Sequence, residues 1–392
     1  MDKYCFLLCT IATTGKFFLM STIFEKYFDS NATLPMSDFH RQTLVDRLAP
    51  MANASSIHGF GRRSKDILEE SRERCAQYLK VDHREIFFTS GATEANHLAI
   101  RGVAQQAKLN QSNVSVYYSQ LEHPCVLDAV SQSSFEHKIE LELNPSGQPK
   151  FDKISDGLQS GDLVLCMAAN NETGQVFDLE TISNNCESKN CHLHVDMVQI
   201  PGKLDVCLNK ITSASFSGHK FGAAKGIGFL YKSRGLEFPP LFNGSQEKGF
   251  RAGTENLIGI LSLSVGIEEL EKRQSEWREQ SLMLRNHFEN RIKFALPWVN
   301  ICCENEDRLV NTSNICFEGV EGESLLFSLD LLGYGVSLGS ACSSGSVEPS
   351  HVLLALGYDE KRARSSLRFS FSHHNNLKSV DDLVDDLVKI VK

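Results

Sequence analysis

The segment SFSGHK, from Ser215 to Lys220, places a lysine directly after an apolar run that predicts a β-strand. A lysine amine can form a Schiff base with a carbonyl compound, and small residues around it let such a compound approach closely. The hydroxyl of Ser217 and the imidazole of His219 could hold a phosphate group. The competing interpretation is a solvent-exposed loop lysine, which is the usual fate of this residue type.

Two further segments place polar residues at the ends of predicted strands. TSGATE, from Thr89 to Glu94, joins a strand to a helix start, where backbone N–H groups and the helix dipole favour an anion. In HVDMVQ, from His194 to Gln199, Asp196 ends a strand and could pair with a pyridinium nitrogen, which makes the ring an electron sink. An ordinary helix N-cap and an aspartate that caps the next turn are the alternatives.

A fourth segment carries a thiol between small residues. Cys342 lies in GVSLGSACSSGS, which spans residues 335–346. This composition predicts a mobile loop with an accessible cysteine, and exposure together with nearby positive charge determines the reactivity of a thiol. The remaining cysteines, among 12 in the chain, fit buried and inert positions better.

The elements that must position these residues alternate along the chain. Apolar runs predict strands over 85–89, 114–118, 163–167, 192–195, 211–216 and 226–231. Helical spacing predicts helices over 64–79, from residue 90, from Pro124, over 257–294 with at least one break, and over 381–392. This alternation predicts a mostly parallel sheet flanked by helices, with ligands at the carboxyl ends of its strands.

The bulk composition narrows the function classes. The 392 residues are 41% hydrophobic and 23% charged, as in a globular protein, and the net charge of -9 argues against nucleic acid or an anionic membrane as the main partner. No CxxC pair occurs, so the usual sign of a structural zinc site is missing, and scattered cysteines indicate a reducing, cytoplasmic compartment. Residues 1–19 form an N-terminal extension that is either a short secretory signal or a start site assigned upstream of Met20.

Further motifs complete a recognisable pattern. They are YFDSNAT at Tyr27, SSIHGFGR at Ser55, EHPCVLDA at Glu122, NNETGQV at Asn170, QEKGFRAGTEN at Gln246, EPSHVLLALG at Glu348 and SSLRFSFS at Ser365. In this order, and with the four segments above, they resemble the class V, fold-type I pyridoxal-phosphate enzymes. Within that group they are similar to the NifS/IscS-type cysteine desulfurases, from about Tyr27 to Phe371. Ser30 and Leu34 depart from the usual residues of the first motif.

The resemblance implies the following roles around pyridoxal phosphate. Lys220 would hold the cofactor as a Schiff base and move the Cα proton of the substrate, and His123 would stack on the ring and assist proton transfer. Asp196 would pair with the ring nitrogen and Gln199 with the ring oxygen. Cys342 would take the substrate sulfur as a persulfide.

Other residues would hold the phosphate and the substrate. The resemblance gives the phosphate to Thr93, Ser217 and His219, with Thr254 reaching in from a second subunit. Asn171 and Arg368 would bind the substrate carboxylate, for which the planar fork of arginine is suited. The complete cofactor-binding set that we predict is Thr93, Glu94, His123, Asn171, Asp196, Gln199, Ser217, His219, Lys220 and Thr254, with no metal ligand.

The resemblance also implies the fold, the domains and the partners. We expect a large cofactor-binding domain over residues 35–258 with a mostly parallel, seven-stranded sheet, and a smaller α+β domain over 20–34 and 259–392 that carries the Cys342 loop. The expected partners are L-cysteine, a second copy of the chain, and a sulfur-acceptor protein in iron–sulfur cluster assembly or in tRNA or cofactor thiolation.

Two rival hypotheses remain open. Another class V reaction without a persulfide, such as transamination or a selenocysteine lyase-like reaction, predicts that Cys342→Ala keeps full turnover. A non-catalytic sulfur carrier or scaffold that retains the fold predicts no cofactor absorbance and a dispensable Lys220.

Overall fold

The computed structural model of the chain describes residues 23–48, 51–151, 157–240, 243–338 and 348–392. The predicted N-terminal extension and Cys342 with its neighbours lie outside these residues. Within the described ranges, no helix combines the length and apolar composition that a membrane span requires.

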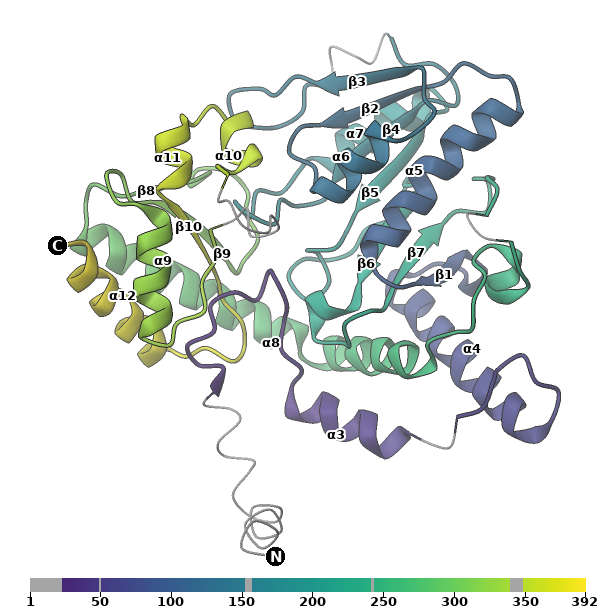
Figure 1. Cartoon of the computed structure of the whole chain (residues 1–392), viewed down its shortest axis with the longest axis horizontal. Helices are drawn as coiled ribbons and strands as arrows, with labels where there is room; N and C mark the ends of the chain where they lie inside the picture. Colours follow the sequence, from purple (N-terminus) through teal and green to yellow (C-terminus); the bar gives the residue numbers. More distant parts are fainter. Residues whose placement is uncertain (1–22, 49–50, 152–156, 241–242, 339–347) are drawn as a thin grey trace, which may run out of the picture.

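A seven-stranded sheet forms the larger layer of the molecule, with the strand order β1-β7-β6-β5-β4-β2-β3 (Figure 1). Its strands are β1 (Ile86–Thr89), β2 (Ser115–Ser119), β3 (His137–Leu141), β4 (Leu163–Met167), β5 (His192–Asp196), β6 (Ser213–Ser217) and β7 (Gly228–Lys232). Only the pairings of β7 with β1 and β6 are antiparallel. The mostly parallel sheet flanked by helices confirms the predicted fold class.

Helices cover both faces of this sheet, so its central strands β4, β5 and β6 are almost completely buried. One core joins the sheet to α5 (Ala92–Leu109) and α6 (Pro124–Ser131). A second core joins it to α4 (Gly59–Leu79), α7 (Leu179–Ser188) and the first half of α8 (Leu257–Ala295). The five residues of β4 are all buried, as expected for a parallel strand with helices on both sides.

A three-stranded antiparallel sheet has a core of its own. Its order is β10-β9-β8, with β8 (Asn300–Ile301), β9 (Thr312–Cys316) and β10 (Ser366–Ser370). The second half of α8, α9 (Gly322–Leu331) and α12 (Leu377–Val391) pack around it. The short elements are α3 (Asp38–Arg47), α10 (His351–Ala355), α11 (Glu360–Arg364) and the 3-10 turns η1 (His83–Glu85), η2 (Gly218–Phe221) and η3 (Gln246–Gly249).

Helix α8 connects the two cores without a break, so the interruption that we expected from its sequence was wrong (Figure 1). Its 39 residues span about 58 Å at about 1.5 Å per residue. Over residues 271–280 the helix is mostly solvent-exposed, and there it carries charges such as Lys272, which pairs with Glu268 at 2.8 Å. The dense charges therefore mark a solvated part of one helix, not its end.

The segment before α3 crosses from the small sheet to the large one. Tyr27 and Asp29 form β-bridges to Gly335 and Ser370, and the backbone N–H of Leu34 donates to the carbonyl of His219 at 2.9 Å. This path brings residues 31–33 against the carboxyl end of β6.

Candidate active site

A cavity of about 700 Å³ lies at the carboxyl ends of β4, β5 and β6, where parallel α/β sheets place their ligands. It brings together polar residues that the sequence separates by more than 300 positions. Its lining includes Asn31, Thr33, Thr93, His123, Cys125, Asn171, Asp196, Gln199, Ser217, His219, Lys220 and Arg368.

Lys220 enters this cavity from the 3-10 turn that directly follows β6. Its Nζ donates to the carbonyl oxygens of Asn31 and Ala32, at 2.8 and 3.1 Å. The lysine is therefore part-buried and aimed inward, which excludes the alternative of an exposed loop lysine. An amine in this setting can form a Schiff base with a carbonyl group in the cavity.

Asp196 ends β5 and is held by a chain of buried side chains. Its Oδ1 accepts from the backbone N–H of Val198, and its Oδ2 accepts from Asn96 Nδ2, both at 3.0 Å. Asn96 Oδ1 lies 2.8 Å from His194 Nε2, and His194 Nδ1 lies 2.8 Å from Ser213 Oγ. Burial lowers the pKa of His194 to about 3, so this imidazole is neutral and fixes the amide of Asn96.

The part of the cavity beside helix α5 is suited to an anion. Helix α5 begins at Ala92. Its N-cap residue Gly91 makes no side-chain hydrogen bond to the first turn, so no capping side chain competes with a ligand for the backbone N–H groups there. Thr93 and Ser217 line the cavity beside this turn. His219 joins them, and its Nδ1 lies 2.9 Å from Thr33 Oγ1.

Gly228 explains how the first turn of α5 comes so close to β6. A Cβ atom at this position would lie 2.4 Å from the carbonyl oxygen of Phe216 and 2.7 Å from Gly91 Cα. Only glycine therefore lets β7, the Gly91 turn and β6 approach one another at this point.

His123 caps the N-terminus of α6 and lines the cavity. Its Nδ1 accepts from the backbone N–H of Cys125 at 3.2 Å and lies 3.1 Å from Cys125 Sγ. Burial lowers the pKa of His123, against an opposing effect of Asp196. The ring is thus a neutral group that can exchange a proton at Nε2.

Arg368 reaches the cavity from β10, and its side chain is only 4% exposed. Its Nη2 lies 2.6 Å from Asp29 Oδ1, and its Nη1 donates to the carbonyl of Asn171 at 3.0 Å. Among the described residues its Nε has no hydrogen-bond partner. The guanidinium is therefore fixed in place and keeps donors for a carboxylate.

Two predicted residues lie away from the cavity within this chain. The carboxylate of Glu94 accepts from Arg251 Nε at 2.7 Å and from the backbone N–H of Ser90 at 2.7 Å. Thr254 is exposed, and a contact with the cofactor would require a second subunit. Cys342, the predicted sulfur acceptor, lies outside the described residues.

Sequence reasoning missed several residues of the site. Asn96 and His194, which orient Asp196, look like unremarkable polar residues within a helix and a strand. Lys203 lies buried behind Gln199 and contacts its Oε1. Cys125 stands in the EHPCV motif, but nothing in the motif shows that its thiol borders the cavity.

The residues present fit pyridoxal phosphate. The cofactor needs an amine, a carboxylate for its ring nitrogen and a cradle for its phosphate, and Lys220, Asp196 and the uncapped start of α5 border one cavity. The orphaned Nε of Arg368 adds a donor for a substrate carboxylate.

Comparisons with known proteins agree with this geometry. The model of the aminotransferase class-V family matches residues 26–383. A cysteine desulfurase of Nostoc sp. is 37% identical over 376 residues, which cover 93% of this chain and 92% of the relative. The cysteine desulfurase NifS of Azotobacter vinelandii is 34% identical over 377 residues, which cover 94% and 92%.

Solved structures show the same similarity. A NifS-like protein superposes with a TM-score of 0.85 at 30% identity, over 93% of this chain and 99% of the other. A NifS-like protein from Rickettsia africae superposes with a TM-score of 0.83 at 27% identity, also over 93% and 99%.

Proposed function

Because this chain belongs to the aminotransferase class-V family and, within it, is a cysteine desulfurase, we propose that it uses pyridoxal phosphate to move the sulfur of L-cysteine to Cys342 and then to an acceptor. One observation carries the proposal. The amine of Lys220, the carboxylate of Asp196 and the uncapped first turn of α5 border a single cavity of about 700 Å³.

In this proposal, residues of the chain bind three groups of the cofactor. Lys220 would bind its aldehyde carbon and Asp196 its ring nitrogen, and Thr93, Ser217 and His219 would hold its phosphate. When bound, pyridoxal phosphate withdraws electrons from the substrate and makes the Cα proton removable. Asp196 supports this chemistry because Asn96 and Val198 hold its carboxylate in one orientation.

Two residues handle protons and one holds the substrate. Lys220 Nζ would take the Cα proton of the substrate, and His123 would exchange a proton at its Nε2. Arg368 binds the substrate carboxylate, and its ion pair with Asp29 fixes the guanidinium before substrate arrives.

The sulfur step balances without an added oxidant. The Cβ–S bond of the substrate breaks and an S–S bond to Cys342 Sγ forms. L-cysteine and an enzyme thiol thus give L-alanine and an enzyme persulfide.

Eight of the described cysteines are poorly suited to accept sulfur because their thiols are buried or partly buried. Cys125 borders the cavity, but burial and the charge of Asp196 raise its pKa to about 12, so it is not a thiolate at neutral pH. Burial likewise raises the pKa of the thiols at Cys75, Cys166, Cys186, Cys191, Cys302, Cys303 and Cys316.

Both flanks of the Cys342 segment are attached beside the cavity. Ser337 pairs with Arg368 in a β-bridge, and Ser350 Oγ donates to Glu172 Oε2 at 2.5 Å. Cys342 follows Ser337 by five positions, a reach of up to about 17 Å. This attachment supports Cys342 as the acceptor that collects sulfur at the cavity and delivers it outside.

The test measures products in solution. Purified chain with L-cysteine and a dithiol reductant should release sulfide and alanine in equal amounts. Lys220→Ala should form neither product, and borohydride should no longer fix the cofactor covalently to the chain. Wild-type protein that forms no alanine would contradict the proposed function.

We further propose that the chain acts as a homodimer in which Thr254 of one copy reaches the cofactor phosphate of the other. Its exposure in the single chain supports this arrangement. A sulfur-acceptor protein, in iron–sulfur cluster assembly or in thiolation, would receive the persulfide. Sedimentation of the holoenzyme at the mass of one chain would contradict the dimer.

A further inference from the structure

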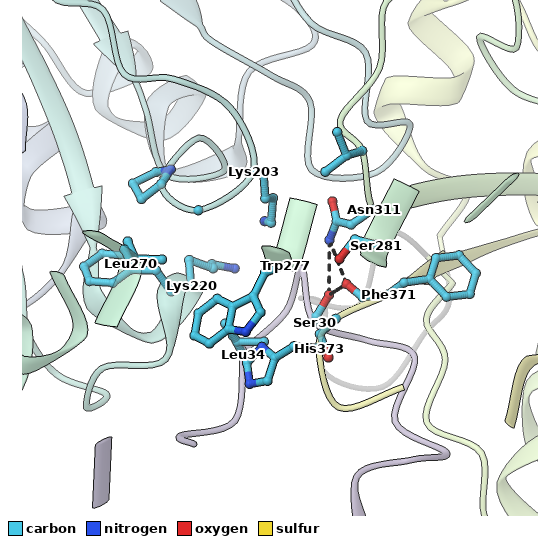
Figure 2. A pocket seen from close by; sticks show the side chains of 15 residues that line it. Ser30, Leu34, Lys203, Lys220, Leu270, Trp277, Ser281, Asn311, Phe371 and His373 are labelled. Atoms are coloured by element: carbon cyan, nitrogen blue, oxygen red, sulfur yellow. Dashed lines mark hydrogen bonds between the residues drawn. The ribbon is translucent and has the colours of Figure 1, made fainter. Parts of the chain in front are cut away.

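A second lysine lies beside Lys220, in a small cavity behind the one that faces the cofactor site (Figure 2). This cavity has a volume of about 40 Å³, enough for a few water molecules. Lys203 and Lys220 both line it, and Figure 2 shows their side chains pointing into the same space. No role follows for Lys203 from the chemistry described so far.

Lys203 contacts the residue expected to bind the cofactor ring oxygen. Its Nζ donates to Gln199 Oε1, and Gln199 Nε2 donates to the carbonyl of Asn31 at 3.1 Å. The same carbonyl accepts from Lys220 Nζ at 2.8 Å. Lys203, Gln199 and Lys220 thus form one connected network around the backbone of Asn31.

The network leaves one orientation for the Gln199 amide. An amine at Lys203 can approach the oxygen of the amide as a donor, and the carbonyl of Asn31 can meet only its nitrogen. Nε2 carries two hydrogens, and Asn31 takes one of them. The other is left for a group in the large cavity, which Gln199 also lines.

Burying the side chain of Lys203 in its environment costs free energy. The side chain is buried, and no carboxylate of the described residues pairs with it. Burial, with the nearby charges of Lys220 and Arg368, holds the pKa of Lys203 well below its usual value. An apolar residue could replace a buried amine that has no ion pair without loss of stability, unless the hydrogen bond of the amine is needed.

We propose that Lys203 is a positioning residue that locks the side-chain amide of Gln199, so that Nε2 faces the ring oxygen of the cofactor. This inference rests on the proposed function. The donor that it secures withdraws electron density from the ring oxygen. That oxygen then holds the proton of the Lys220 Schiff base less firmly, and the Schiff base loses the proton at a lower pH.

The test follows the visible absorbance of the purified holoenzyme during a pH titration, which reports the Schiff-base proton. Lys203→Met fills similar space without a donor, so Gln199 Oε1 loses its partner and only Asn31 still holds the amide. The titration midpoint should rise by about 0.5–1 pH unit, as expected for one lost hydrogen bond. Gln199→Leu should raise it by a similar amount, and the double variant should add nothing further.

Two comparisons make the result decisive. Lys203→Arg keeps a donor and adds a permanent charge, so its midpoint should stay at the wild-type value or fall below it. If Lys203→Met does not fold, two variants still test the proposal. Gln199→Leu must raise the titration midpoint, and Lys203→Arg must not raise it.

Different results would contradict the inference and the proposed function. A wild-type protein without Schiff-base absorbance would contradict the proposed function. Two results would overturn the role of Lys203 in a wild-type protein whose absorbance does titrate. One is a Lys203→Met titration curve identical to that of wild type, and the other is additive shifts of the midpoint in the double variant.

Discussion

Glu122 is a carboxylic acid with almost no access to water. Its Oε1 accepts from the backbone N–H of Met167 at 2.5 Å. Burial, together with the charge of Asp196, raises the pKa of Glu122 to about 8. The group is therefore protonated at neutral pH and adds no second negative charge beside Asp196.

The raised pKa of Glu122 predicts a pH-dependent stability. The native state keeps the proton between about pH 4.5 and pH 8, whereas the unfolded chain loses it. Stability from this group is complete below about pH 4.5 and is lost as the pH rises through the folded pKa, by at most about 1.4 kcal/mol per pH unit. Denaturant unfolding of wild type and Glu122→Gln should diverge in this window, with the variant favoured at high pH. A difference that does not change with pH would contradict the assignment.

At the residue scale, the sequence predicted the residues that would carry out the chemistry better than the residues that hold them in position. Asp196 ends one strand of a predicted parallel sheet and Lys220 closely follows another, so their meeting at one edge could be expected. Lys203 could not be predicted, because an isolated lysine is normally solvent-exposed. Asn96 lies 100 residues from Asp196, and no local pattern reports a contact over that separation.

At the element scale, the approach of β7 to the start of α5 predicts a sharp effect of one methyl group. Gly228→Ala would force the carbonyl of Phe216 and the Gly91 turn apart, at a cost of about 1–3 kcal/mol. It should also weaken cofactor retention, because the phosphate cradle moves. Gly235→Ala is the matched control, since its Cβ would meet no atom within 4 Å. Equal thermal stability and cofactor content in the two variants would exclude this role.

The attachment of α10 gives a second prediction at this scale. Ser350 caps α10 through the backbone N–H of Leu353 and donates to Glu172, whose pKa burial raises. Ser350→Ala should lower the rate of sulfide release several-fold, because the flank of the Cys342 segment loosens, and should leave the cofactor absorbance unchanged. Ser328→Ala, at an exposed helix position, serves as the control. Loss of the absorbance itself would show a role in the cofactor site instead.

Apolar runs located six of the seven strands of the large sheet, and the remaining strand shows the limit of that signal. Strand β3, HKIEL, is mostly exposed at the sheet edge, so its residues are polar and no hydrophobic run indicated it. The apparent break in α8 has the same cause, since the solvent-exposed part of this helix has no apolar stripe. Periodicity therefore reports burial, and it predicts elements only where they are buried.

At the scale of the whole molecule, α8 sets the distance between the two sheets because both cores pack on it. Arg368 and Ser337 belong to the small-sheet side, whereas Lys220 and Asp196 belong to the large one. The cavity thus lies between the two, and the residues that would bind substrate and hold the Cys342 segment share the small sheet. The predicted domains, residues 35–258 and residues 20–34 with 259–392, remain our proposal.

The most direct test is a single turnover without reductant, followed by mass analysis of the peptide that contains Cys342. We expect about one alanine per chain and a Cys342 peptide heavier by one sulfur atom. Cys125→Ser should leave both results intact, and Cys342→Ser should abolish sulfur transfer. Full alanine production by Cys342→Ser, or the extra sulfur on Cys125, would contradict the account.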